Sequence, residues 1–291
     1  MPPADGKIAF DGLAQHYAQA RPGYPAELVA ATAAAVDGVG GDAARERVMV
    51  DVGAGTGIST RAIASALRRP TRVLGVEPGE DMRRQAQAGA AAGGSTPGAP
   101  DGDAPSGPAA GDAAGGGSRG AVSRIEYVAG AAERLPVEDG GAVGVQVAQA
   151  IHWFDRPRFY AEVKRVLARG GVLAIMQNNR AWERSALVDA YETLLERHSP
   201  GYVRAYRVFD VAAELAESGG FGPCERIVVP WERPMAPDQF VTMARSSSRF
   251  DAVVARYGAE QAERMVRALL PPEARALMVP FDAELFLART V

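Results

Sequence analysis

The stretch V-D-V-G-A-G-T-G, residues 50–57, decides the fold. Its first three residues end a β-branched run that begins at Arg47 and predicts a short strand, and its glycines lead into a helix predicted over 60–67. A glycine turn lets the backbone approach a ligand closely, and helix N–H groups can meet an anionic group there. A second strand is predicted at 71–77. Strand, turn, helix and strand make a βαβ unit of a parallel sheet.

The same alternation continues along the chain. Further strands are predicted at 124–129, 142–148, 171–177, 226–232 and 280–289. Further helices are predicted at 24–36, 82–92, 156–167, 181–198, 210–218, 237–244 and 259–270. Five parallel strands followed by two late strands predict one open α/β sheet and not two mirrored halves.

Residues 93–120 interrupt this pattern. They are almost entirely Gly, Ala, Pro, Ser and Asp, with no large apolar side chain to bury. Such a segment cannot offset the entropy of ordering it, so we expect a disordered insertion in a surface loop. The cost of closing a loop grows slowly with its length, and the fold therefore tolerates the insertion.

Composition narrows the class of protein. The chain has 291 residues, of which 47% are hydrophobic and 23% charged, as in soluble globular proteins. A net charge of −3 without a basic patch argues against nucleic acid or an anionic membrane as a partner. No apolar run approaches the roughly 20 residues of a membrane helix, and the start lacks the blocks of a signal peptide. The single cysteine, Cys224, excludes an internal disulfide and a thiolate metal cluster. We expect a cytoplasmic enzyme or binding protein without a metal.

Glu77 makes the glycine turn more informative. The dinucleotide pattern G-x-G-x-x-G fails because its third glycine position, counted from Gly53, holds Ile58, and the Lys-Ser/Thr of a phosphate-binding loop is absent. Glu77 ends the second strand, about 20 residues past the glycines, where a carboxylate can accept hydrogen bonds from both hydroxyls of a ribose. The alternative is a tight turn followed by a surface glutamate.

Several segments together resemble one family. V-D-V-G-A-G-T-G with V-L-G-V-E-P (73–78) resembles motifs I and II of class I S-adenosylmethionine-dependent methyltransferases. The resemblance extends over most of the chain outside the insertion, through F-D-G-L-A-Q-H-Y-A-Q-A-R-P-G-Y-P (10–25), I-E-Y-V-A-G-A-A-E-R-L-P (125–136), A-Q-A-I-H-W-F-D (148–155), L-A-R-G-G-V-L-A-I (167–175) and the closing A-E-L-F-L-A-R (283–289). H-W-F and R-P-x-Y-P are most similar to the branch with trans-aconitate methyltransferase-like and type 11 methyltransferase proteins.

This resemblance implies an architecture. The fold would be Rossmann-like, with a mostly parallel seven-stranded sheet, an antiparallel last strand and helices on both faces. Residues 1–291 would form a single methyltransferase domain. Residues 1–40 would supply a helical lid, and 178–275 would include a helical cap over the acceptor pocket.

The resemblance also implies a site for S-adenosylmethionine. Gly53, Ala54 and Gly55 would pass beneath its methionine part, Asp51 would orient the loop or meet the ammonium through water, and Glu77 would hold the ribose. The other cofactor positions it implies are Gly57, then Pro78, Met82, Ala131 and Ala132 around the adenine, and Gln149 and Ala150 near the methionine part. Many relatives carry Asp, Ser or Thr where Ala131 stands, so the resemblance supplies no side-chain bond to the adenine amino group there.

The acceptor side is expected where the fourth strand ends, because ligands of open α/β sheets bind at the carboxyl ends of the strands. There the resemblance implies a wall of His152, Trp153 and Phe154. His152 is either a general base or an imidazole held by a backbone carbonyl, and both remain open.

Three further residues complete the implied acceptor site. Tyr17, in the opening helix, is a second candidate base. Arg21 either pairs with a carboxylate of cofactor or substrate or lies exposed before Pro22. Ser247 belongs to the cap.

The predicted reaction is attack by an oxygen, nitrogen or carbon of a small-molecule acceptor on the sulfonium methyl, with a carboxylate or hydroxyl favoured. No nucleic acid or membrane partner is expected, and the protein would be a monomer or homodimer.

Two alternative functions stay open. One is an enzyme that binds S-adenosylmethionine for non-methylating chemistry, such as a cyclase or pericyclic catalyst. The other is a degenerate protein that only binds the cofactor.

Overall fold

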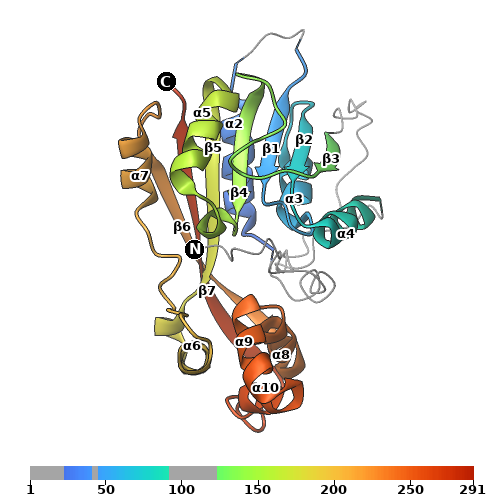
Figure 1. Cartoon of the computed structure of the whole chain (residues 1–291), viewed down its shortest axis with the longest axis vertical. Coiled ribbons are helices and arrows are strands. Elements are labelled where there is room, and N and C mark those ends of the chain that lie inside the picture. The colour runs from blue at the N-terminus through green and yellow to red at the C-terminus, as the bar shows by residue number, and fades with distance from the viewer. Residues whose placement is uncertain (1–22, 41–44, 92–122) are drawn as a thin grey trace, which may run out of the picture.

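The structure is a computed structural model that describes residues 23–40, 45–91 and 123–291. Its centre is a seven-stranded sheet in the order β3-β2-β1-β4-β5-β7-β6 (Figure 1). The strands are β1 (Val48–Val52), β2 (Arg72–Val76), β3 (Arg124–Val128), β4 (Ala142–Ala148), β5 (Leu167–Arg180), β6 (Glu225–Met235) and β7 (Leu277–Arg289). The pairs among β1 to β5 are parallel, and β7 is antiparallel to both β5 and β6. The predicted fold class, with its antiparallel last strand, is confirmed.

Helices cover both faces of this sheet (Figure 1). The apolar sides of α5 (Arg156–Val166) and α7 (Val211–Ser218) pack in one core cluster with β1, β4 and β5. On the other face, α2 (Ala26–Asp37) and α3 (Ile58–Ala66) form a second cluster. All residues of β1 and β4 are buried, as expected of central parallel strands covered on both faces. The βαβ unit read from the glycine stretch is therefore the middle of the sheet.

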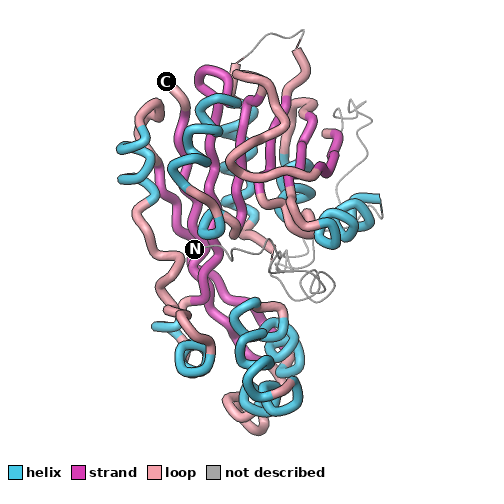
Figure 2. Tube along the Cα trace, viewed as in Figure 1, coloured by secondary structure: helices cyan, strands magenta, loops and turns pink. Residues whose placement is uncertain are grey.

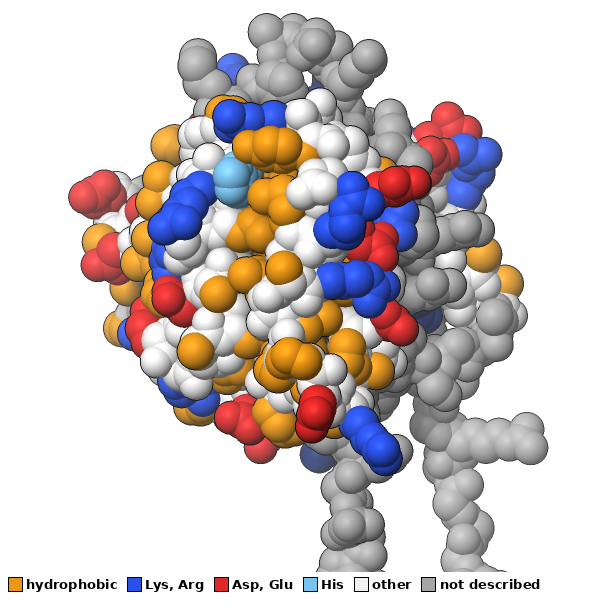
Figure 3. Space-filling view, turned by 90° about the horizontal axis from the view of Figure 1, so that it is seen from below, with side chains coloured by type: hydrophobic (Ala, Val, Ile, Leu, Met, Phe, Trp, Pro, Cys, Tyr) orange, Lys and Arg blue, Asp and Glu red, His pale blue; other side chains and the backbone are white. Residues whose placement is uncertain are grey.

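A separate core lies at one end of the molecule. There α6 (Ala186–His198), α8 (Pro237–Arg245), α9 (Ser248–Tyr257) and α10 (Ala259–Arg267) pack with the ends of β6 and β7 (Figure 2). Viewed from this end, hydrophobic side chains run along the middle of the face and charged ones flank them (Figure 3). The division of the chain into one domain with a lid and a cap stays a prediction.

Further helices follow the strands, and β5 and α9 differ from what the sequence predicts. α4 (Glu80–Ala91) follows β2, and the short helices η1 (Ile151–Trp153) and η2 (Trp182–Arg184) follow β4 and β5. β5 is twice the length predicted, because it pairs with β7 as far as Arg180. The sequence analysis assigns no element to 245–258, where α9 lies. Long antiparallel pairing and helix packing in the cap are tertiary effects that local periodicity does not report.

In the described ranges, no helix is both long enough and apolar enough to cross a membrane. The same ranges contain no group of three or more His, Cys, Asp or Glu that could hold a metal ion. The predicted insertion at 93–120 lies outside the described residues.

Candidate functional site

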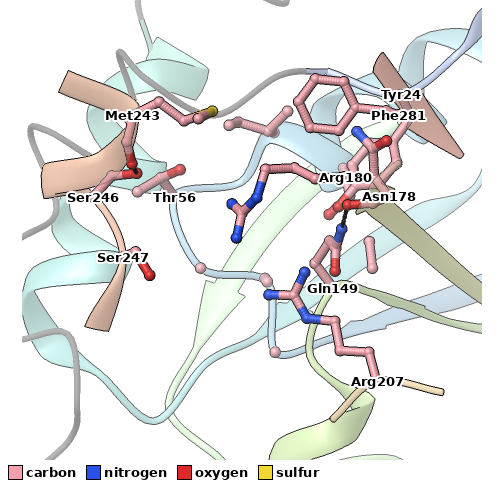
Figure 4. Close-up of a pocket in the computed structure, with 16 residues that line it drawn as sticks. Tyr24, Thr56, Gln149, Asn178, Arg180, Arg207, Met243, Ser246, Ser247 and Phe281 are labelled. Carbon is pink, nitrogen blue, oxygen red and sulfur yellow. Dashed lines mark hydrogen bonds between the residues drawn. The ribbon is translucent and has the colours of Figure 1, made fainter. Parts of the chain in front are cut away.

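A cavity lies at the carboxyl ends of β1, β4 and β5 (Figure 4). About 730 Å³ of space lies between its walls, part of which is open solvent. The glycine loop after β1 forms one wall and the turn between α8 and α9 forms another. The lining residues are Tyr24, Gly53, Ala54, Gly55, Thr56, Ile58, Ser59, Ala148, Gln149, Asn178, Arg180, Arg207, Met243, Ser246, Ser247 and Phe281. Residues from seven separate segments of the chain therefore meet at one edge of the sheet.

The glycine loop has a backbone that other residues would not adopt without strain. Gly53, Gly55 and Gly57 have φ of 70°, 55° and 77°. A Cβ added at Gly53 would meet the Cβ of Ala150 at 2.5 Å, so the loop lies close against the end of β4. A Cβ at Gly57 would collide with the hydroxyl of Tyr127. The loop is thus packed on both sides, which fixes the position of the cavity wall.

Asp51 holds the helix that follows the loop. Its side chain is fully buried, and its Oδ2 accepts hydrogen bonds from Ser59 Oγ at 2.8 Å and Thr60 Oγ1 at 2.6 Å. Burial raises the pKa of Asp51, and the two hydroxyl donors oppose that shift. The structure therefore connects Asp51 to the first turn of α3, and the carboxylate does not line the cavity.

Glu77 connects β2 to the glycine loop. One carboxylate oxygen accepts a hydrogen bond from Gly55 N at 3.0 Å, and the other accepts one from Gly79 N at 2.8 Å. Burial raises the pKa of Glu77, while these backbone bonds lower it. A carboxylate has about four acceptor positions, so two remain for other donors. Glu77 is accordingly a buried anion that already orders the loop.

Gln149 is strained where β4 ends. Its φ is 58°, the only positive φ at a non-glycine among the described residues. Such a conformation costs on the order of 1–3 kcal/mol and is typical of functional sites. The side chain enters the cavity, where Nε2 donates to the carbonyl oxygen of Asn178 (Figure 4). Its Oε1 is buried without a hydrogen-bond partner in the described part of the chain, which makes it available to a ligand donor.

The residues expected around an adenine lie at the β2 and β3 side of the same edge. Met82 and Ala132 are buried, whereas Pro78 and Ala131 are exposed. None of the four lines the cavity described above. They follow β2 and β3 just as the glycine loop follows β1, so they extend the site along the edge of the sheet.

The H-W-F cluster occupies η1 and the residue after it. The His152 ring lies 5.1 Å from that of Trp153 and 5.2 Å, edge to face, from that of Tyr206. Phe154 packs on Phe159 at 5.1 Å and against the main core. All three rings are half-buried, and none lines the cavity. His152 therefore faces the connection between α6 and α7, the Arg249 guanidinium lies 5.7 Å from the ring centre of Trp153, and Phe154 lies close to Gly53 of the glycine loop.

The remaining predicted site residues are Ser247, Ala150, Tyr17 and Arg21. Ser247 lines the cavity, and its Oγ also caps α9 by accepting from Arg249 N at 3.3 Å. Ala150 is buried beneath Gly53. Tyr17 and Arg21 lie outside the described residues.

Several residues that line the cavity are not among the predicted site residues. Asn178 and Arg180 end β5, so the rule that ligands bind at carboxyl ends of strands could have found them. Tyr24 lies in the quoted R-P-G-Y-P segment. Arg207 and Phe281 carry no local signal. Phe281 reaches the cavity because β7 pairs with β5 there, and Arg207 comes from the connection between α6 and α7.

Comparison with known proteins connects the edge of this sheet to one family. Residues 50–175 match the methyltransferase domain family. The match begins in β1, includes the glycine loop and Glu77, and ends in β5.

Individual relatives agree with that match. An uncharacterized methyltransferase of Mycobacterium bovis is 29% identical over 177 residues, covering 60% of this chain and 54% of that protein. A protein of Dictyostelium discoideum named as a methyltransferase is 26% identical over 166 residues, covering 57% and 47%. The chain thus spans about half the length of the curated relatives it matches.

Solved structures extend the likeness beyond the matched segment. A protein from Anaeromyxobacter dehalogenans described as a type II methyltransferase is 25% identical, with a TM-score of 0.58 over 92% of this chain and 97% of that one. A structure from Bacillus halodurans, also described as a methyltransferase, is 18% identical, with a TM-score of 0.50 over 89% and 97%, and shares the fold.

Proposed function

We propose that this chain, a member of the class I S-adenosylmethionine-dependent methyltransferases, transfers the methyl group of that cofactor to a small-molecule acceptor. One observation carries the proposal. The buried carboxylate of Glu77 accepts a hydrogen bond from Gly55 of a loop with positive φ, at the sheet edge where the cavity opens. This pairing of loop and acid is what a ribose next to a close backbone approach requires.

The residues at the edge fit such a cofactor. Glu77 has acceptor positions left for two ribose hydroxyls, and Gly53 and Gly55 leave room for a ligand beside the backbone. The buried Oε1 of Gln149 can accept from an ammonium group. Met82 and Ala132, with Pro78 and Ala131 at the surface, would hold the adenine, and Asp51 would keep the first turn of α3 in place.

The bound cofactor supplies an already activated methyl group, so the chain's main tasks are to position the acceptor and to exclude water. Holding both reactants in line is worth on the order of 7–11 kcal/mol of the barrier. The Ser246–Ser247 turn, which lines the cavity, would help to fix the acceptor there. A carboxylate acceptor needs no base. A hydroxyl acceptor would pass its proton to water or to His152, whose contribution as a base would be about 10²–10⁴-fold.

The architecture and partners belong to the same proposal. We infer one methyltransferase domain with a helical cap within 178–275, acting as a monomer or homodimer. The net charge of −3 supports an acceptor other than nucleic acid.

Two measurements test the proposal. Calorimetry should detect binding of S-adenosylhomocysteine and no binding of NAD. Incubation with methyl-labelled S-adenosylmethionine and a panel of organic acids and alcohols should release S-adenosylhomocysteine with one class of acceptor. A protein that binds neither S-adenosylmethionine nor S-adenosylhomocysteine would contradict the proposal. Cofactor consumed without label in an acceptor would favour the non-methylating alternative.

A further inference from the structure

The cavity has a positively charged wall. Arg180 enters it from the end of β5, and Arg207 enters it from the connection between α6 and α7 (Figure 4). Among the described residues that line the cavity there is no Asp or Glu. Two guanidinium groups from different parts of the chain therefore share a space that contains no lining carboxylate.

Arg180 is fixed in place by a buried acid. Its Nε donates to Glu192 Oε1 at 2.7 Å, and the two side chains are 19% and 3% exposed. The other oxygen of Glu192 accepts from Tyr202 Oη at 2.5 Å, and the guanidinium lies 5.2 Å from the ring centre of Tyr191. Glu192 and Tyr191 already fix the side chain of Arg180. A ligand that binds the remaining N–H groups of its guanidinium therefore costs little further side-chain entropy.

Arg207 lies next to the aromatic ring of Tyr206, which Arg249 also contacts. Its guanidinium lies 4.8 Å from the ring centre of Tyr206, and that of Arg249 lies 5.3 Å from the same ring. The edge-to-face contact of His152 with Tyr206 joins the H-W-F cluster to these side chains. A smaller hollow, lined by Tyr206, Arg207 and Arg180 among others, lies behind the cavity. Arg207 thus lines the cavity and also contacts Tyr206, the ring against which His152 packs.

Several other charged groups lie near these two guanidinium groups in the described part of the chain. Arg204, in the same connection, pairs with Glu196 and Asp189, so those two carboxylates are engaged with it. Glu192 is the carboxylate that faces Arg180. The described lining of the cavity therefore contains the guanidinium groups of Arg180 and Arg207 and no Asp or Glu, and Glu192 pairs with Arg180. A cavity of this charge attracts anions.

We propose that Arg180 and Arg207 bind a carboxylate or phosphate group of the methyl acceptor as an anchor, and that another atom of the acceptor receives the methyl group. This inference rests on the proposed function. Guanidinium groups match carboxylate and phosphate oxygens with paired hydrogen bonds. An oxygen held by two guanidinium groups is a poor nucleophile, because its lone pairs and charge are already engaged.

The transfer then balances without another reactant. A lone pair of the receiving atom forms the bond to the methyl carbon while the carbon–sulfur bond breaks, and the electrons of that bond stay on sulfur. If the receiving atom is a hydroxyl oxygen, its proton leaves to water or to a nearby base. The anchored anion keeps its charge throughout, so the acceptor must have at least two functional groups.

The test uses the full chain saturated with S-adenosylhomocysteine and three probes: glutarate, inorganic phosphate and the neutral glutaramide. We expect glutarate and phosphate to bind and glutaramide to bind at least about tenfold more weakly, the loss of roughly one charge-assisted hydrogen bond. Arg207→Gln should lower the affinity for glutarate by a similar factor. Arg197→Gln, which removes an exposed charge on α6, is the matched control and should leave the affinity unchanged.

Arg180→Lys is the second variant, because a lysine keeps a positive charge opposite Glu192 and preserves the buried pair. It should melt near the wild type and bind glutarate about tenfold more weakly, since an ammonium lacks the planar fork. Equal affinity for glutarate and glutaramide in the wild type would overturn the proposal, as would equal effects of Arg207→Gln and Arg197→Gln.

The anion could also be the carboxylate of the cofactor itself, and a further pair of ligands separates the two sources. S-adenosylhomocysteine carries that carboxylate, and 5′-methylthioadenosine does not. If Arg207→Gln weakens S-adenosylhomocysteine alone, the guanidinium serves the cofactor and the proposal is wrong. If both ligands bind the variant as they bind the wild type, the proposal holds. Failure of the wild type to bind S-adenosylhomocysteine would instead overturn the proposed function.

Discussion

The two sides of the cavity are built differently. The side of the glycine loop uses residues close together in the chain, Asp51 with Ser59 and Thr60, and Glu77 with Gly55 and Gly79, joined by short hydrogen bonds. The opposite side takes Gln149, Arg180 and Arg207 from separate elements and closes with the turn at Ser246–Ser247. The first side is a local structure that a βαβ unit forms wherever it folds. The second exists only once the helices α6, α8, α9 and α10 and the long antiparallel strands have packed.

The largest effect is expected at Glu77. Glu77→Ala should weaken S-adenosylhomocysteine binding by about 1.5–3 kcal/mol, or roughly 10- to 150-fold, because it removes hydrogen bonds to a charged acceptor. It also removes the bond to Gly55 N, so melting should fall as well. Calorimetry and thermal unfolding measure the two effects. Glu80→Ala, an exposed acid at the start of α4, is the control for charge. Unchanged affinity in Glu77→Ala would end the ribose assignment.

The same carboxylate should make cofactor binding depend on pH. Burial raises the pKa of Glu77 above 4.5. The neutral carboxyl therefore adds to the free energy of unfolding at pH values below the pKa of the unfolded chain, and this contribution is lost as pH rises through the pKa of the folded chain. Ribose hydroxyls donate to the ionised form. S-adenosylhomocysteine should therefore bind more weakly as pH falls through that pKa, and binding just below it should release protons.

Calorimetry in two buffers with different heats of ionisation measures this release. Asp51 also has a pKa raised by burial, but its carboxylate is fully buried and bonded to Ser59 and Thr60 of α3, so Glu77→Gln should abolish the release. Equal proton release in wild type and variant would assign the titration to another group.

Gln149 tests whether the second side of the cavity stores strain. Gln149→Val should cost about 1–3 kcal/mol more stability than Gln149→Gly, because a β-branched residue resists positive φ and glycine does not. Denaturant unfolding of both variants gives the difference directly. Two variants of equal stability would mean that the backbone at this position relaxes at little cost.

His152 tests whether the aromatic cluster serves the acceptor. We expect His152→Ala to keep near-wild-type melting and cofactor affinity, since the ring is half-buried, while acceptor turnover falls at least about tenfold. His198→Ala is a matched control in the cap, where the imidazole bonds to Tyr257 Oη at 2.9 Å. A sharp drop in melting for His152→Ala alone would identify a structural residue. Undiminished turnover would show that the acceptor needs neither a base nor a contact there.

The smallest effect is expected for residues 93–120. Replacing them with a short Gly-Ser linker should leave melting and cofactor binding nearly unchanged, because they contain no large apolar side chain. Thermal unfolding of the shortened chain measures this. A fall of 10 °C or more, about 3 kcal/mol for a domain of this size, would mean that the segment packs.

Much of the first side could be predicted from sequence. β1, β2, β4 and the helices between them lie within two residues of the predicted bounds, because buried β-branched runs and glycine turns are local signals. The structure adds that Glu77 bonds to the glycine loop itself. The H-W-F cluster follows the strand end, as the sequence predicts. Its contacts with Phe159 and Tyr206 depend on tertiary packing, and its role at the acceptor stays a prediction.

By itself, the sequence determined the α/β class, the central βαβ unit and the acid after the second strand, because each depends on residues near one another in the chain. Only the tertiary structure decided the length of β5, the presence of α9 and the meeting of Arg180 with Arg207. Those features depend on pairing between β5 and β7, about 100 residues apart, and on cap helices that bury their apolar sides against each other. Local periodicity shows that a strand or helix has an apolar side but does not show what covers it.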